Sequence, residues 1–575
     1  MTVIDVEVIS EGPYADGQIF ADGGQYVMRR LVLTHAFDPL SPANLTIVDL
    51  PLAPRDDDGL VRCQQDIVVL APRDPERNNG RVLVDAVNRG RPTSPGLLNR
   101  DTTPPFPVPD EPHAGDGHLF RYGWTVVLAG WQFDIDHPKL LGLKAPMAVD
   151  GGTALRGQVV YSAMPPTDVG ELKLGLPGHR PFAGVPGAPA SMTETDDSGM
   201  GEAQIVPNSD WSFGGDGRSV IRAGGFRAGR RYEVVYTTEG ATIGGCGLAA
   251  LRDLAPWVRA EQGAESVVLL GVSQCGRMIR QMLHDGLNVD EAGQQAYDAV
   301  MPVIAGVRMG QFNRRFGNPG VLPIGDDGLG GPVTYAELLQ ASEATNSAPL
   351  VMALNTSAEY WRGDAHLVHQ GSPPHSGVRV HHVAGTQHSA GLVPQMFADP
   401  YHGTRGRHGF GTVDYRPVAR GLLQQLVDWI DGVEPADDTV PTADVLTSRE
   451  SVLARFVEAG RDVPDVRSFG EPPGPVPDIG ADLNELGGIR LPDIAVPIGI
   501  HAAWNLRHPD FGAPTHQLAL TGSTVWHDDL PGLEHHLAAA RSVAQELAQQ
   551  RWIIASDIDV LVADADARWS EAAKG

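Results

Sequence analysis

The amino-acid sequence predicts an α/β fold: a mostly parallel sheet with helices on both faces. From about residue 81 onward, short apolar runs alternate with segments of helical periodicity. The runs are continuously apolar rather than strictly alternating, which is typical of strands that are covered on both faces. These predicted strands lie in 81–90, 123–131, 265–273, 297–306, 349–355 and 378–385.

Helical periodicity marks several segments next to these runs. Leucines spaced three residues apart predict a helix over 245–260, and an apolar residue at every fourth position predicts one over 417–431. A third pattern of this kind covers 533–551. Before residue 81 the sequence pattern is different. Runs of β-branched residues separated by Gly, Pro, Asp and Asn predict strands within 2–10, 26–37, 44–52 and 64–72.

These changes in sequence pattern divide the chain into four parts. Residues 1–80 form an N-terminal β-rich region, and residues 81–134 and 244–435 form the α/β core. Residues 135–243 separate two core strands by far more than a plain crossover needs, so we interpret them as an inserted lid or cap; a merely decorative surface insertion is the alternative. Residues 436–575 form a C-terminal extension that packs on the core.

Charge and cysteine content narrow the class of protein. There are 44 Lys plus Arg against 71 Asp plus Glu, a formal net charge of −27, which disfavours binding to nucleic acid or to anionic membranes. Three cysteines are too few for a disulfide framework, and no apolar run approaches the ~20 residues that span a bilayer. The first residues lack the features of a signal peptide. We therefore expect a cytoplasmic protein, while its oligomeric state stays open.

Ser273 lies where a predicted strand turns directly into a predicted helix, in the segment GVSQCGR (271–277). A strand, a sharp turn with a central Ser and a helix make up a nucleophile elbow, which needs small neighbours so that strand and helix approach closely. The segment departs from the G-x-S-x-G pattern, since Cys275 occupies the second position after Ser273 and Gly276 follows it. A serine in such a turn can also be a plain helix cap.

Partners for Ser273 follow in the order nucleophile, acid, base. Glu359 is the first acidic residue after the predicted strand 349–355, and Asp364 is its competitor. His388 follows the last predicted strand, where it can reach Ser273 as a general base that the acid orients.

An oxyanion hole needs two N–H donors. The backbone amide of Gln274 is one candidate, and the turn around Arg89 and Gly90, after the strand 81–90, is the other, although it can also be a simple turn. Residues at strand ends near the predicted site are candidate pocket residues. They are Trp131, Gln132, Tyr360 and Trp361, of which Trp131 can equally be a core residue.

Taken together, these segments resemble a family, the α/β-hydrolase domain proteins of bacteria that carry a G-x-S-Q-S-G-R elbow. Besides GVSQCGR, with Cys275 in place of the usual Ser, the matching segments are VNRGR (87–91), GWTVVLAGWQFD (123–134), GLAALRDL (247–254), NTSAEYW (355–361), GTQH (385–388) and IRLPDIAVPIGIHAAWNLR (489–507). The resemblance implies an α/β-hydrolase fold and a triad of Ser273, Glu359 and His388. It also implies hydrolysis of carboxylic esters of small molecules without a cofactor.

Other readings of these residues stay open. A metal-dependent hydrolase could use the histidines of 366–408, beginning with His366 and His369 beside Asp364, although no helical H-E-x-x-H frame is present. Cys275 could act as a thiol nucleophile. The chain could also be a catalytically inactive binding protein, and within the enzymes a peptidase, lactonase, thioesterase or dienelactone hydrolase would use the same machinery.

Overall fold

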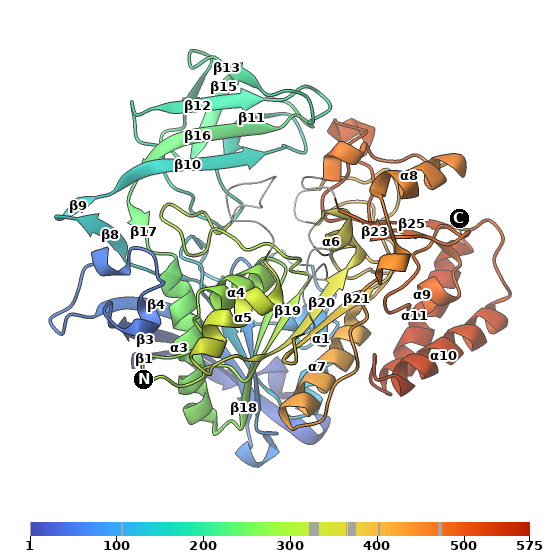
Figure 1. The fold of residues 1–575 in the computed structure, drawn as a ribbon, viewed down its shortest axis with the longest axis horizontal. Coiled ribbons are helices and arrows are strands. Elements are labelled where there is room, and N and C mark those ends of the chain that lie inside the picture. Colours follow the sequence, from blue (N-terminus) through green and yellow to red (C-terminus); the bar gives the residue numbers. More distant parts are fainter. Residues whose placement is uncertain are drawn as a thin grey trace.

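A computed structural model describes residues 2–104, 107–320, 333–363, 365, 375–400, 403–469 and 474–574. The chain builds one large central sheet, an inserted β-rich part above it and a C-terminal extension beside it (Figure 1). Among the described residues, no helix has both the length and the apolar character that crossing a membrane requires.

The central sheet has eleven strands and is antiparallel at one end and parallel at the other. Its main path runs β1-β3-β4-β6-β5-β18-β19-β20-β21, with β2 paired to β3 and β7 paired to β4. Pairing is antiparallel from β1 to β6 and parallel from β6 to β21. Its strands are β1 (Val3–Pro13), β2 (Ile19–Phe20), β3 (Gly24–Phe37), β4 (Val61–Pro72), β5 (Arg81–Ala86), β6 (Thr125–Ala129), β7 (Leu143–Lys144), β18 (Ser266–Val272), β19 (Ala299–Val303), β20 (Leu350–Thr356) and β21 (Val378–Val383).

Both faces of the parallel half are covered, as the continuous apolar runs predict. In β18, Val267 and Leu269 pack into the hydrophobic cluster on one face, whereas Val268 and Leu270 pack into the cluster on the other. Helices α3, α4 and α5 contribute to the first cluster and α7 to the second. The helices of this part are α1 (Ser94–Leu98), α2 (His118–Arg121), α3 (Gly245–Gln262), α4 (Gln274–His284), α5 (Tyr335–Ala344), α6 (Ser357–Trp361) and α7 (Arg416–Ile430).

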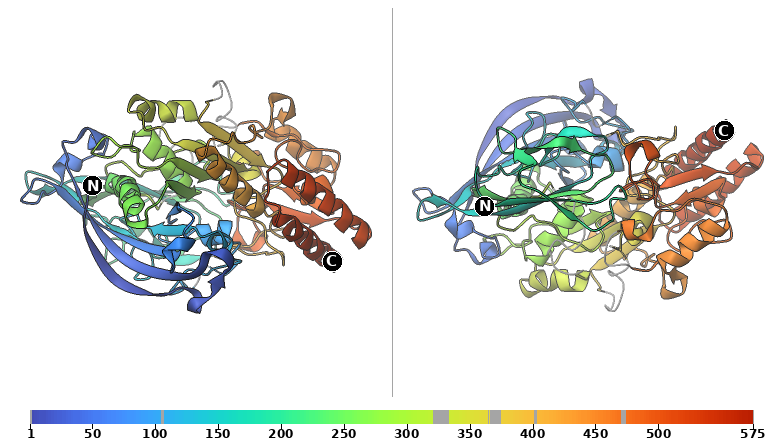
Figure 2. Two further views of the ribbon diagram at one scale, coloured as in Figure 1. Left: turned by 90° about the horizontal axis from the view of Figure 1, so that it is seen from below. Right: turned by 90° about the horizontal axis from the view of Figure 1, so that it is seen from above.

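The N-terminal region 1–80 is β-rich, and its strands β1, β3 and β4 belong to the same sheet as the core strands and curve around one side of it (Figure 2). One expectation for this region needs correction. The predicted strand within 44–52 is absent, and 3-10 turns stand there instead, at Pro42–Asn44 and Leu50–Leu52. Each turn contains a proline, at its first position in Pro42–Asn44 and at its second in Leu50–Leu52. Asp49 has a left-handed φ of 64°, which a strand cannot accommodate.

Residues 135–243 form a β-rich insertion, except that β7 within this range pairs with the central sheet. A four-stranded sheet, β10-β16-β12-β13, packs on a three-stranded sheet, β11-β15-β14, through aromatic contacts such as Phe226 with Tyr232 and Phe213 with Tyr236. A further small sheet has the order β17-β8-β9. The strands are β8 (Met147–Asp150), β9 (Thr153–Ala154), β10 (Arg156–Ala163), β11 (Val169–Lys173), β12 (Ala190–Glu194), β13 (Gln204–Val206), β14 (Trp211–Phe213), β15 (Ser219–Phe226), β16 (Tyr232–Glu239) and β17 (Ala241–Thr242).

The C-terminal extension combines short strands with two long helices that lie at the opposite end of the molecule from the N-terminal strands (Figure 2). Helix α10 confirms the prediction for 533–551, whereas α11 has no counterpart in the sequence-based prediction. The elements are β22 (Leu446–Thr447), α8 (Arg449–Glu458), β23 (Val476–Pro477), α9 (Pro492–Ala495), β24 (Gly499–Ala502), β25 (Ser523–Trp526), α10 (Leu533–Gln549) and α11 (Asp557–Ala572).

Candidate active site

Ser273 occupies the sharp turn between β18 and α4. Its backbone has φ 59° and ψ −112°, a conformation that L-residues rarely adopt, and its N–H donates to the Val303 carbonyl of the neighbouring strand at 2.8 Å. The turn is tight, since a Cβ at Gly271 would lie 2.4 Å from the Cys275 carbonyl oxygen and one at Gly276 would lie 2.8 Å from Ala305 Cβ. Glycine at these two positions therefore makes the turn sterically feasible.

Ser273, His388 and Glu359 form one hydrogen-bonded chain. His388 Nε2 lies 2.8 Å from Ser273 Oγ, and His388 Nδ1 lies 2.6 Å from Glu359 Oε1. Glu359 and His388 are 1% and 4% exposed, whereas Ser273 is partly exposed. Glu359 and His388 are thus shielded from water, while Ser273 is partly exposed.

The acid is fixed by the way α6 begins. Thr356 caps this helix, and Glu359 closes a capping box by accepting hydrogen bonds from Thr356 N at 2.7 Å and Thr356 Oγ1 at 2.5 Å on Oε2. Its other oxygen, Oε1, is left for His388. Burial opposes ionisation, but the charge of His388 and the hydrogen bonds from His388 and Thr356 outweigh it and lower the pKa of Glu359.

His388 is held through its backbone as well as through its ring. His388 lies in the loop after β21, and Tyr415, just before α7, donates its hydroxyl proton to the His388 carbonyl at 2.9 Å. Burial raises the pKa of Tyr415, so this hydroxyl remains a donor across the neutral range. The loop that carries His388 is therefore also held by Tyr415, at the start of α7.

The two candidate oxyanion segments meet beside Ser273. Gln274 is the first residue of α4, so its N–H has no acceptor within the helix. Asn88 Nδ2 donates to the Val272 carbonyl at 3.0 Å, which fixes the 88–91 turn against the end of β18. Gly90 has φ 79°, and a Cβ there would lie 2.7 Å from Leu140 Cβ.

The backbone amide of Arg89 already has an acceptor within the protein. Its N–H donates to Gln132 Oε1 at 2.9 Å, and Gln132 Nε2 in turn donates to Asp134 Oδ1 at 3.2 Å. The buried side chain of Gln132, which follows β6, thus already accepts the hydrogen bond of the Arg89 N–H. Gln274 and Gly90 remain the candidate backbone donors.

The four candidate pocket residues lie in packed surroundings, each no more than 4% exposed. Trp131 contacts Phe312 edge-on and donates to the Val87 carbonyl at 3.0 Å, so it is a core residue. Tyr360 packs against the His382 ring, and Trp361 packs against Phe469. Gln132 accepts the Arg89 N–H, as described above.

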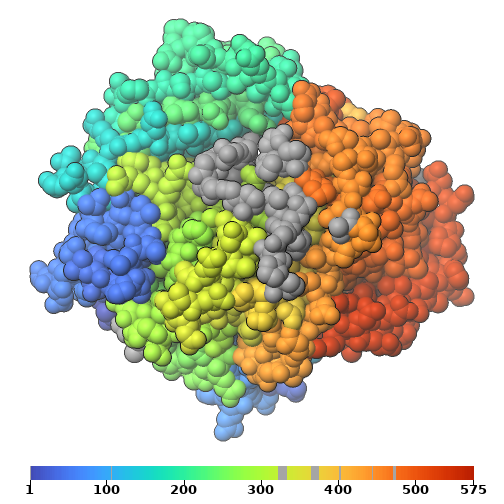
Figure 3. Space-filling model, viewed as in Figure 1, coloured from blue at the N-terminus to red at the C-terminus, as the bar shows by residue number. Residues whose placement is uncertain are grey.

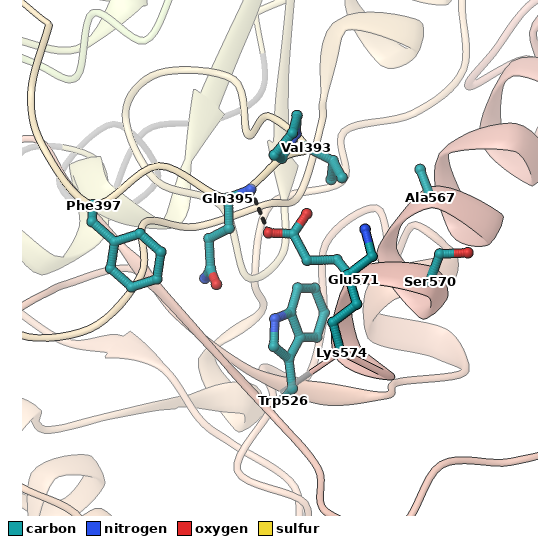
Figure 4. A pocket seen from close by; sticks show the side chains of 9 residues that line it. Val393, Gln395, Phe397, Trp526, Ala567, Ser570, Glu571 and Lys574 are labelled. Atoms are coloured by element: carbon teal, nitrogen blue, oxygen red, sulfur yellow. Dashed lines mark hydrogen bonds between the residues drawn. The ribbon is translucent and has the colours of Figure 1, made fainter.

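A separate open pocket of about 640 Å³ lies at the far end of α11, between Gln395, Phe397 and Trp526 (Figure 4). Within it, Glu571 accepts a hydrogen bond from the Gln395 backbone N–H at 2.7 Å. Neither a histidine nor any residue of the Ser273–His388–Glu359 chain lines this pocket. We therefore place the candidate reaction centre at the elbow and not here.

Several residues of the alternative readings, Asp364, His366, His369 and His402, lie outside the described residues. Of the histidines that are described, His375 pairs with Glu343 at 2.7 Å, and His381 packs against Trp552 with its pKa lowered to about 3 by burial and by Arg379. In the part of the chain that the structure describes, no cluster of three or more His, Cys, Asp or Glu has a metal-binding arrangement.

Cys275 is fully buried, two residues after Ser273. Its Sγ lies 3.4 Å from the Val87 carbonyl oxygen, and burial raises the pKa of the thiol. Since the thiolate is the reactive form, this environment disfavours Cys275 as a nucleophile.

Two residues that support the candidate site, Thr356 and Glu485, are not among those predicted from the sequence. Thr356 could have been found from the sequence, because the pattern T-x-x-E at 356–359 is that of a capping box. Glu485, which contacts both the acid-bearing and the base-bearing loop, has no such signal, since its partners lie 100 and 128 residues away.

The lowered pKa of Glu359 predicts an acid-sensitive contribution to stability. The native carboxyl binds its proton less readily than the unfolded one, so its contribution is complete above the ordinary pKa of about 4.3 and is lost as pH falls through the lower native value. We expect unfolding midpoints measured from pH 6 down to about 3 to fall less steeply in Glu359→Gln than in the wild type. Equal slopes would contradict the lowered pKa.

Comparison with known proteins agrees with this architecture. The family model described as alpha/beta hydrolase domain matches residues 220–563, more than half of the chain. No curated protein matches the sequence significantly.

Among solved structures, brefeldin A esterase, a bacterial homologue of human hormone-sensitive lipase, shares 11% identity with a TM-score of 0.19 and covers 56% of this chain and 60% of its own. A glucuronoyl esterase from Teredinibacter turnerae shares 7% identity with a TM-score of 0.23 and covers 62% of this chain and 61% of its own. These TM-scores are too low to carry an argument. The family match together with the sheet order and the turn at Ser273 shows that the chain belongs to the alpha/beta hydrolase domain family.

Proposed function

We propose that this protein is a serine hydrolase that cleaves carboxylic esters of small molecules through an acyl-enzyme on Ser273. The observation that carries the proposal is the unbroken hydrogen-bonded chain from Ser273 Oγ through His388 to Glu359. A hydroxyl at the tip of an elbow, a histidine within proton-transfer distance and a buried carboxylate behind it are the parts that nucleophilic acyl transfer requires.

In the proposed mechanism, His388 Nε2 accepts the proton of Ser273 Oγ as this oxygen attacks the ester carbonyl. Glu359 orients the imidazole through Nδ1–H and stabilises its positive charge. The protonated His388 then donates to the leaving alcohol, which leaves the acyl group on Ser273. Water that His388 deprotonates attacks the acyl-enzyme, and the same histidine returns the proton to Ser273 as the acid departs.

The negative charge that develops on the carbonyl oxygen needs donors that are already in place. The Gln274 N–H at the N-terminus of α4 supplies one, reinforced by the positive end of the helix dipole. We assign the second to the Gly90 amide, which Asn88 and Gln132 hold beside the elbow. The start of α4 positions the Gln274 amide and these contacts hold the 88–91 turn, so we expect little reorganisation when substrate binds.

We propose that the insertion acts as a lid over this site. It packs on segments that follow the carboxyl ends of β6 and β19, where Phe182 contacts Phe133 and Phe316. Its far side approaches the C-terminal extension, since a Cβ at Gly229 would lie 2.6 Å from Ala513 N, and the two parts meet in Figure 3. A substrate would then be selected by the space that these parts leave above Ser273.

The first test is covalent labelling. We expect a fluorophosphonate to modify Ser273 of the wild type, and the Ser273→Ala variant to stay unlabelled and lose turnover by on the order of 10⁶-fold. Peptide mass spectrometry locates the adduct. Cys275→Ser is the matched control, because a buried thiol that takes no part in catalysis can be replaced with labelling and turnover retained.

Two outcomes of this labelling would contradict the proposal. A folded wild type that is not labelled at Ser273 would favour the inactive binding protein. Loss of labelling in a Cys275→Ser variant that still folds would favour the hypothesis that Cys275 is the nucleophile.

The second test distinguishes the two acids. Glu359→Gln removes the charge that stabilises the imidazolium and presents an amide donor to Nδ1, so we expect kcat to fall by about 10⁴-fold. Asp364→Asn should leave kcat within a few fold of the wild type. Steady-state kinetics on a chromogenic ester measure both, and the reverse ranking would transfer the acid role to Asp364.

A further inference from the structure

Glu485 brings a buried carboxylate from the C-terminal extension to the back of the candidate site. The segment around it joins the tip of β21, where Ile489 N–H donates to the His382 carbonyl at 2.8 Å and Ala384 N–H donates to the Ile489 carbonyl at 3.0 Å. Neighbouring β23 lies beside α6 (Figure 1). The main chain that carries Glu485 is therefore fixed relative to both triad-bearing loops.

A single oxygen of Glu485 joins these two loops. Its Oε2 accepts hydrogen bonds from Ser357 Oγ at 2.5 Å and from Gly385 N–H at 2.9 Å. Ser357 precedes the acid Glu359 by two residues, and Gly385 precedes the base His388 by three. One atom thus connects the acid-bearing segment to the base-bearing segment.

Direct hydrogen bonds between the two loops complete the arrangement. Thr386 N–H donates to Ser357 Oγ at 3.2 Å, and Ser357 N–H donates to Thr386 Oγ1 at 3.3 Å. Ser357 and Thr386 are fully buried and Glu485 is 3% exposed, so water does not compete for these bonds. In such surroundings each bond is stronger and more directional than at a surface.

Stability alone does not readily explain why a carboxyl group is buried at Glu485. Burying a carboxylate is costly, and apolar residues of similar size often replace buried ionic groups without loss of stability. His382 Nε2 lies 3.4 Å from the same oxygen. A carboxylate oxygen, with more than one lone-pair direction, suits a position where two donors from different loops must converge.

We propose that Glu485 is a positioning residue for the proposed hydrolase: it sets the separation of Glu359 and His388 by holding Ser357 and Gly385 on one oxygen. It does not touch the substrate and transfers no proton. The inference rests on the proposed function, because it concerns how well the acid orients the base during acyl transfer. A displacement of about 1 Å in such a pair lowers the rate by on the order of 10²-fold.

The test compares Glu485→Met, which has no strong acceptor, with Glu485→Gln, whose amide oxygen can still accept both hydrogen bonds. Fluorophosphonate titration counts active sites, so that kcat is expressed per competent site. For Glu485→Met we expect kcat to fall by about 10- to 100-fold with KM within about 2-fold of the wild type, and for Glu485→Gln we expect most of the loss to be restored.

Asp557→Asn is the matched control. Asp557 is another buried acid of the C-terminal extension, paired with Arg420 at 2.9 Å. Its replacement should lower the unfolding midpoint without changing kcat per site. Equal kcat per site in Glu485→Met and the wild type would overturn the inference, and so would a rise in KM at unchanged kcat.

Ser357→Ala keeps the inference testable if Glu485→Met does not fold. This variant loses one hydroxyl, and we expect a loss in kcat of about 10-fold with KM retained. An unchanged kcat would overturn the inference. Failure of the proposed function is a separate result, since it would appear as absent labelling and turnover in the wild type itself.

Discussion

The left-handed turn at Ser273 is the constraint on which the site depends. A residue with a side chain at φ 59° costs on the order of 1–3 kcal/mol, and the neighbouring structure must compensate for it. The hydrogen bond from Ser273 N–H to the Val303 carbonyl and the absence of side chains at Gly271 and Gly276 both serve this turn. In return the hydroxyl stands clear of the sheet edge, with a helix N-terminus directly behind it.

Polar contacts hold Glu359 and His388, the partners of Ser273. Packing of the apolar core alone would not fix the positions of these two side chains. Glu359 is bound twice, by the helix cap at Thr356 and by the imidazole, so its two oxygens have different roles. His388 is supported by Tyr415 from before α7. The C-terminal extension adds Glu485 behind both loops. The catalytic geometry we propose is therefore a property of several segments that are distant in sequence.

The sequence predicts what is local in this fold. Continuous apolar runs identify β5, β6, β18, β19, β20 and β21, because a strand buried on both faces needs apolar residues at nearly every position. The positions of Ser273, Glu359 and His388 at strand ends follow from the same runs. The segment 44–52 is mispredicted, since its β-branched residues resemble a strand while Pro51 and the left-handed Asp49 favour a turn.

What the sequence does not predict is pairing over distance. Nothing near Arg89 indicates that Gln132 occupies its amide, and nothing near Glu485 indicates its contact with Ser357. The two packed sheets of the insertion and the helix α11 also depend on tertiary contacts rather than on strong periodicity.

The central claim is that Ser273 becomes acylated during turnover, and rapid-quench mass spectrometry tests it most directly. The wild type would be mixed with a short-chain chromogenic ester, quenched in acid on the millisecond scale, digested and examined for peptides that carry the acyl group. We expect transient acylation of Ser273, with release of the alcohol before the acid. Formation of product while Ser273 stays unmodified at every quench time, or acylation of a different residue, would contradict it.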